Sequence, residues 1–124
     1  MLASSKIIGF ALTTDYARAR EFYEGKLELR FVSQDDYALV MRSGENMVRI
    51  SKAPGFTPLR STVLGWEVSD IEAAAKWLHG RGVGLEKYPW VQSESGIWAT
   101  PNGDKVAWFK DPDGNVLSIS QHNR

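Results

Sequence analysis

Two charged residues stand among apolar neighbours in strand-like sequence, and both could take part in chemistry. Arg49 lies in the run 47–51, and Glu67 ends the run 63–67. An arginine in such a place can hold a ligand carboxylate or phenolate through paired hydrogen bonds. A glutamate buried in a cavity can act as a general base. The alternative is that the two side chains neutralise each other or that one points to solvent, because a buried pair alone indicates no chemistry.

Aromatic residues form a second group of candidates. Trp90 and Trp98 flank the segment 89–96, which has no clear secondary-structure pattern. Flat rings at a pocket rim can stack on a ligand or simply pack, and Tyr88 is a further candidate of the same kind. Three other tryptophans lie in regular elements and are expected in the core between sheet and helices: Trp66, Trp77 and Trp108.

The two histidines and the absence of cysteine limit the kinds of catalysis and metal binding that the chain could support. Without cysteine there are no disulfides, thiolate metal sites or cysteine nucleophiles. His79 is expected to be exposed on a helix. His122 would share a strand face with Ser118 if the last strand extends that far, but a frayed C-terminal residue is the simpler expectation. With the histidines so placed, no Ser/His/Asp arrangement is readable.

Composition predicts one soluble domain. The chain has 124 residues, enough for one core but not for two independent ones. Fifteen basic and fifteen acidic residues give no net charge, so neither nucleic acid nor an anionic membrane is expected as a partner. No signal peptide or membrane-spanning segment is visible, which favours a cytoplasmic location.

The elements that must position these residues occur as two copies of one unit. Repeat 1 covers residues 5–52, with strands expected near 6–14, 27–33, 37–41 and 47–51 and a helix capped by Asp15. A linker at 53–60 leads to repeat 2 at 61–122. Its strands are expected at 62–68, 83–88, 106–110 and 116–121, and a capping box of Ser69 and Glu72 opens its helix. Each half therefore reads βαβββ within a single domain.

Two motifs in these repeats resemble those of a known family. The run Phe109-Lys110-Asp111-Pro112-Asp113-Gly114-Asn115 resembles the closing hairpin of the glyoxalase / bleomycin-resistance / extradiol-dioxygenase (vicinal oxygen chelate) superfamily. Asp15, Arg18, Ala19, Phe22 and Tyr23 resemble its first helix. The resemblance implies an α+β fold in which eight strands form a U-shaped sheet around a cavity, often in a dimer.

The resemblance also implies where a metal would bind, and the residues there are unsuitable. Metal-dependent members carry ligands at four matched positions, which here hold Ile8, Arg49, Val63 and Ser118. Ile and Val have no lone pairs to donate, and a guanidinium repels a cation. We therefore expect no metal and no cofactor. Metal-dependent glyoxalase or dioxygenase chemistry would require a different alignment of these positions.

Strand alternation and the same resemblance together predict a mainly apolar cavity. Ile8, Phe10 and Leu12 would face it from the first strand, and Val63, Gly65 and Glu67 from the fifth, where Gly65 leaves room for a ligand. Six residues are predicted to bind the ligand: Phe10, Arg49, Glu67, Trp90, Trp98 and Ser118.

These residues predict a metal-free homodimer that binds an aromatic or amphipathic small molecule, like the bleomycin-resistance branch of the superfamily. One alternative is a metal-independent isomerase or lyase that uses Glu67 as its base. Another is a scaffold that only associates with a partner protein.

Overall fold

A computed structural model describes residues 1–91 and 93–123. The chain divides into two compact units, the first comprising Met1–Pro58 and the second beginning at Leu59. No helix in the described residues has the length and apolar composition that a membrane crossing needs.

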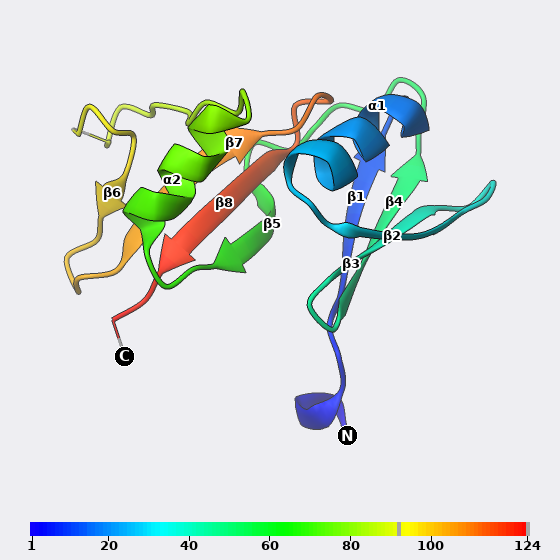
Figure 1. Cartoon of the computed structure of the whole chain (residues 1–124), viewed down its shortest axis with the longest axis horizontal. Coiled ribbons are helices and arrows are strands. Elements are labelled where there is room, and N and C mark those ends of the chain that lie inside the picture. Colours follow the sequence, from blue (N-terminus) through cyan, green and yellow to red (C-terminus); the bar gives the residue numbers. More distant parts are fainter. Residues whose placement is uncertain (92, 124) are drawn as a thin grey trace. The chain divides into compact units, whose positions relative to one another are not determined.

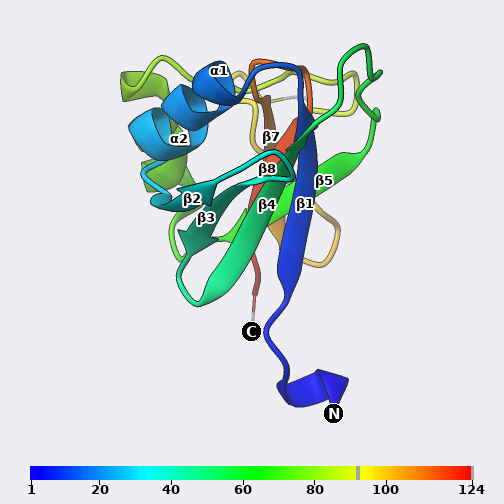
Figure 2. The same ribbon diagram turned by 90° about the vertical axis from the view of Figure 1, so that its right-hand side faces the viewer.

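The first unit is a four-stranded sheet with a helical segment on one face (Figures 1 and 2). Its strands stand in the order β1-β4-β3-β2, and β1 pairs with β4 in parallel while the other pairs are antiparallel. The elements are η1 (Leu2–Ser4), β1 (Ile8–Thr13), α1 (Tyr16–Arg20), η2 (Glu21–Lys26), β2 (Arg30–Gln34), β3 (Leu39–Ser43) and β4 (Asn46–Lys52).

The helix of this unit starts where the sequence predicts. The Asp15 carboxylate accepts hydrogen bonds from the amides of Ala17 and Arg18, at 2.9 and 3.3 Å. After Arg20 the α-helix widens into the π-helical turn η2, which buries Phe22 and Tyr23. This wider turn brings both rings into the core.

The second unit repeats the plan, with strand order β5-β8-β7-β6. Figure 1 shows α2 lying across β7 and β8. The elements are β5 (Thr62–Glu67), α2 (Ile71–Gly80), β6 (Trp98–Ala99), β7 (Lys105–Lys110) and β8 (Val116–Gln121). β5 and β8 are parallel neighbours, as β1 and β4 are in the first unit.

Two local predictions for this unit are wrong. Residues 83–88 do not form a strand; only an isolated bridge joins Glu86 to Trp108. The outer strand is instead the two-residue β6, because the Asn102-Gly103 turn pairs Trp98 and Ala99 with β7. The cap of α2 is Asp70, whose carboxylate accepts from the amide of Ala73, and not the predicted box of Ser69 and Glu72.

The predicted α+β class with two βαβββ halves is confirmed. The backbone hydrogen bonds between strands divide into two sheets of four, one in each unit.

Candidate functional site

The second sheet has one covered face and one open face. Ala107, Phe109, Leu117 and Ile119 are buried on the face that α2 covers. Because successive residues of a strand point to opposite faces, the residues between them lie on the open face. Register places Gly65, Ser118 and Trp108 in one row across this face, and Glu67, Ser120, Val106 and Trp98 in the next.

Three aromatic rings gather around Trp108 on the open face. Its ring centroid lies 5.5 Å from that of Tyr88, 5.9 Å from that of Trp90 and 6.1 Å from that of Trp98. Tyr88 and Trp90 are stacked in parallel with centroids 4.8 Å apart. Trp90 remains 50% exposed, so the cluster presents aromatic surface to solvent.

Trp108 was expected in the core, and that prediction is wrong. It lies directly opposite Ser118 across the closing hairpin, on the open face. Counting residues outward from the turn Asp111–Asn115 along both strands pairs Trp108 with Ser118. Because paired residues share a face, this count could have placed Trp108 on the open face from the sequence. Trp77 is also not a core residue: it is 41% exposed, and the Arg81 guanidinium lies 4.9 Å from its ring centroid. Only Trp66 packs as predicted, against the buried Phe109.

The absence of a side chain at Gly65 makes room for the side chain of Ser118. A Cβ atom at residue 65 would lie 2.6 Å from the Ser118 Oγ, closer than nonbonded atoms approach. The space expected to admit a ligand above Gly65 is therefore taken in part by Ser118. The glycine allows the Ser118 hydroxyl to lie over the neighbouring strand.

Glu67 does not meet the condition on which its role as a base depends. It ends β5 and is exposed rather than enclosed. Arg49 belongs to the other unit.

No Ser/His/Asp arrangement is readable in the sequence, but the structure brings such a set together at the end of β8, where His122 is hydrogen-bonded on both ring nitrogens. The His122 Nε2 lies 2.9 Å from the Ser120 Oγ, and its Nδ1 lies 3.0 Å from the Asp104 Oδ2. The Asn102-Gly103 turn brings Asp104 back beside the end of β8, a proximity that sequence spacing does not reveal.

The first sheet also has an open face, and its apolar residues are exposed. Ile8, Phe10 and Leu12 of β1 are 44%, 63% and 41% exposed. Phe10 lies directly beside Arg49 of β4, which in turn lies beside Val40 of β3. The structure therefore brings the predicted residues Phe10 and Arg49 together.

Arg49 has an acidic neighbour in the turn between β2 and β3. The amides of Tyr37 and Ala38 donate to the Asp35 Oδ1 at 2.8 and 3.0 Å. These two hydrogen bonds, with a smaller contribution from the charge of Arg49, lower the pKa of Asp35. The guanidinium of Arg49 is thus already within the field of a carboxylate.

The four positions at which the family resemblance implies metal ligands are divided between the two units, with Ile8 and Arg49 in the first and Val63 and Ser118 in the second. Ile8 lies on the same face as Arg49, two residues along β1 from the residue paired with it. Val63 is the extra residue of a bulge between Thr62 and Leu64, so the ladder does not determine its facing. Within the described residues no cluster of three His, Cys, Asp or Glu side chains is placed to hold a cation.

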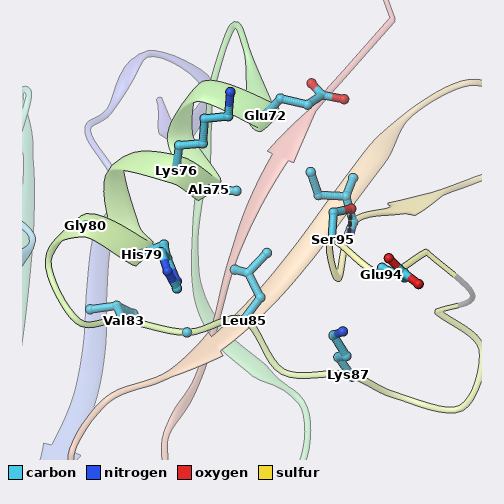
Figure 3. A pocket seen from close by; sticks show the side chains of 12 residues that line it. Glu72, Ala75, Lys76, His79, Gly80, Val83, Leu85, Lys87, Glu94 and Ser95 are labelled. Atoms are coloured by element: carbon cyan, nitrogen blue, oxygen red, sulfur yellow. Dashed lines mark hydrogen bonds between the residues drawn. The ribbon is translucent and has the colours of Figure 1, made fainter.

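A pocket of about 590 Å³ lies on the other side of the second sheet, between α2 and the segment that follows it. Figure 3 shows Ala75 and His79 of α2 on one side and Leu85, Lys87 and Ser95 on the other. None of the six predicted binding residues lines this pocket. The predicted residues lie instead on the open sheet faces and beside them.

The parallel β1–β4 and β5–β8 pairs and the closing hairpin agree with one known family. The model of the Glyoxalase/Bleomycin resistance protein/Dioxygenase superfamily matches residues 8–119. This chain belongs to that superfamily. No curated protein matches it closely enough to add a more specific relative.

Solved structures of other superfamily members share the fold across nearly the whole chain. A bleomycin resistance determinant encoded on transposon Tn5 is 21% identical, with a TM-score of 0.76 over 98% of this chain and 100% of its own. A superfamily member from Sphaerobacter thermophilus is 19% identical, with a TM-score of 0.74 over 98% and 100%. Lactoylglutathione lyase from Agrobacterium tumefaciens is 16% identical, with a TM-score of 0.72 over 95% and 93%. At these identities the likeness establishes the fold alone.

Proposed function

We propose that this protein binds an aromatic or amphipathic small molecule on the open face of its second sheet, without a metal. The observation that carries the proposal is the cluster of Tyr88, Trp90 and Trp98 around Trp108. Membership of the Glyoxalase/Bleomycin resistance protein/Dioxygenase superfamily supports a small-molecule-binding role.

The cluster suits a flat ligand for two physical reasons. Its rings are held against one another, so little side-chain entropy is lost when a further ring stacks on them. Ser118 contributes a hydroxyl in the row next to Trp98, which can orient a polar substituent. A largely apolar surface with one or two polar groups is typical of small-molecule sites.

Metal-assisted chemistry is not part of the proposal, because the donor set is unsuitable. Ile8 and Val63 have no donor atoms, Arg49 is a cation, and Ser118 is a single weak ligand. We further propose a homodimer, in which a second copy covers exposed apolar residues such as Phe10.

A pair of probes with the same ring system tests the proposal. Titrations would follow the fluorescence of 1-anilinonaphthalene-8-sulfonate, which is anionic, and of N-phenyl-1-naphthylamine, which is neutral. Trp98→Ala should weaken both probes by about fivefold to tenfold, since one aromatic contact contributes roughly 0.5–1.5 kcal/mol beyond its buried area. Trp77→Ala is the matched control, because Trp77 is an exposed tryptophan on α2. Thermal melts would confirm that both variants fold; equal losses in the two variants would contradict the proposal.

We propose Arg49, with the adjoining Phe10, as a second and separate binding place on the first sheet, and the same probes test it. Arg49→Ala should weaken the anionic probe by about tenfold and leave the neutral probe nearly unchanged, because only the former offers a sulfonate to the guanidinium. An equal loss for both probes would show that Arg49 acts by packing and not by charge.

A further inference from the structure

Ser120, His122 and Asp104 form a hydrogen-bonded relay at the edge of the second sheet. The Ser120 Oγ lies 2.9 Å from the His122 Nε2, and the His122 Nδ1 lies 3.0 Å from the Asp104 Oδ2. The three groups are connected in the order hydroxyl, imidazole and carboxylate. This is the order that activates a serine as a nucleophile in hydrolases of unrelated folds.

The hydrogen bonds determine which ring nitrogen carries the proton. An ionised carboxylate can only accept, so the His122 Nδ1 must donate to the Asp104 Oδ2. In the neutral ring the Nε2 then carries no proton and accepts a hydrogen bond from the Ser120 hydroxyl. The imidazole is therefore held in the tautomer that a general base requires.

Asp104 is itself held in place. The amide of Asn123 donates to its Oδ1 at 2.9 Å, which leaves the Oδ2 directed at His122. Its backbone carbonyl accepts from the Thr100 amide at 2.8 Å, across the turn between β6 and β7. With a side-chain exposure of 23%, Asp104 is partly shielded from solvent, while His122 at 36% remains accessible.

The row that contains Ser120 leads through an aliphatic residue to an aromatic one. Ser120 pairs with Val106 of β7, and Val106 pairs with Trp98 of β6, so the three share the open face. Glu67 lies opposite Ser120 on β5. Lys105 is bound to Glu72 on the opposite face at 3.1 Å. Among the described residues of this unit, Asp104 and Glu67 are the charged groups placed beside the relay by hydrogen bonding and strand register.

We propose that Ser120 is a nucleophile toward aryl esters, with His122 as general base and Asp104 as the positioning residue. The Oγ attacks the ester carbonyl carbon, and its proton passes to the His122 Nε2. The C–O bond to the phenol breaks, the imidazolium returns the proton to the departing phenolate, and an acyl-Ser120 remains. Water then attacks this ester and regenerates the serine. The indole of Trp98 offers a surface for the aryl group.

The same geometry limits the reaction to activated esters. Ser120 lies inside a strand paired on both sides, so its own amide lies in the plane of the sheet and not on the open face. One missing oxyanion donor costs about 10²–10³ in rate. Glu67 further disfavours negative charge on the attacked oxygen. We expect a burst of phenolate followed by slow deacylation.

Two probes test the proposal on the whole chain. With p-nitrophenyl acetate, the protein should release a burst of about one p-nitrophenolate per chain. A fluorophosphonate, whose fluoride leaves when the Oγ attacks phosphorus, should add once, and peptide mapping should find the adduct on Ser120. An adduct elsewhere, or none, would overturn the proposal without recourse to any variant.

Variants separate the relay from background imidazole chemistry. Ser120→Ala and His122→Ala should each lower the burst rate by at least about 100-fold, within the range that positioned general bases supply. His79→Ala is the matched control, since it removes the other histidine and should leave the burst unchanged. A burst that survives in His122→Ala, with an unaltered thermal melt, would contradict the proposal.

Asp104→Asn distinguishes a positioning role from a structural one. The amide can still accept from Asn123, so the turn should persist and the thermal melt should change little. The burst rate should fall by at least about tenfold, because the asparagine nitrogen left facing the His122 Nδ1 is a donor and favours the tautomer that cannot act as the base. An unchanged burst rate with an unaltered thermal melt would show that Asp104 only tethers the end of the chain. The binding proposal is tested with different probes and can hold or fail independently.

Discussion

At the scale of single residues, the ability of a charged side chain to bind a ligand depends on its charged neighbours. Arg49 stands beside Phe10 on an open face and also within the field of Asp35. Because the pKa of Asp35 is lowered, this carboxyl stays ionised at pH values where an ordinary aspartate begins to take up a proton. Asp35 therefore competes with any anionic ligand for the guanidinium.

Asp35→Asn should relieve this competition. The asparagine Oδ1 can still accept from Tyr37 and Ala38, so the turn is kept while the charge is lost. Affinity for 1-anilinonaphthalene-8-sulfonate should rise by about twofold to fourfold, with a smaller gain at high salt because exposed charges are screened. Asp36→Asn, the neighbouring exposed aspartate, is the control and should have a smaller effect. Equal gains would mean that only net charge matters.

At the scale of elements, the turn from Asp111 to Asn115 sets the register of the second sheet. The Asp111 Oδ1 accepts from the amides of Asp113 and Asn115, both at 2.9 Å, and its Oδ2 accepts from the Asn115 side chain at 2.7 Å. Asp111 is only 7% exposed. The turn thereby places Trp108 opposite Ser118 and Val106 opposite Ser120.

Asp111→Ala should destabilise the fold by about 2–4 kcal/mol, because it leaves buried donors without their acceptor. Urea unfolding would measure the change, and Asp36→Ala, at an exposed position, should remain within about 0.5 kcal/mol of the parent. A loss below about 1 kcal/mol for Asp111→Ala would mean that water replaces the missing carboxylate.

At the scale of the whole molecule, each unit buries one face of its sheet and leaves the other open. In the first unit the open face carries Ile8, Phe10 and Leu12, each at least 41% exposed. Exposed apolar residues in a row along one strand are typical of an interface. They form the structural basis for the proposed homodimer.

Phe10→Glu should convert the proposed dimer into a monomer, because it places a charge among apolar residues that a second copy would cover. Sedimentation equilibrium would measure the mass. Trp77→Glu introduces the same charge at an exposed aromatic residue on α2 and should leave the dimer intact. A parent protein that is monomeric at all concentrations would rule out the dimer.

Sequence reasoning succeeded where the signal is local or repeated. The hairpin Asp111–Asn115, the cap Asp15 and the strand Val116–Gln121 follow from turn chemistry and alternation, and together with the repeat they determine the fold class. The same reasoning put Ile8, Phe10 and Leu12 on one face of their strand, because the side-chain period of a strand is two. It failed for residues 83–88, which form only an isolated bridge from Glu86 to Trp108.

Only the tertiary structure decided which side chains meet. The cluster around Trp108 joins rings from β6, β7 and the segment before them, and the relay of Ser120 and His122 needs Asp104 from a different turn. Such contacts depend on which strands pair and in what register, and a shift of one residue would have turned Trp108 and Ser120 toward α2. Sequence determined the types of residue and the elements that carry them; strand pairing determined which of them share a face.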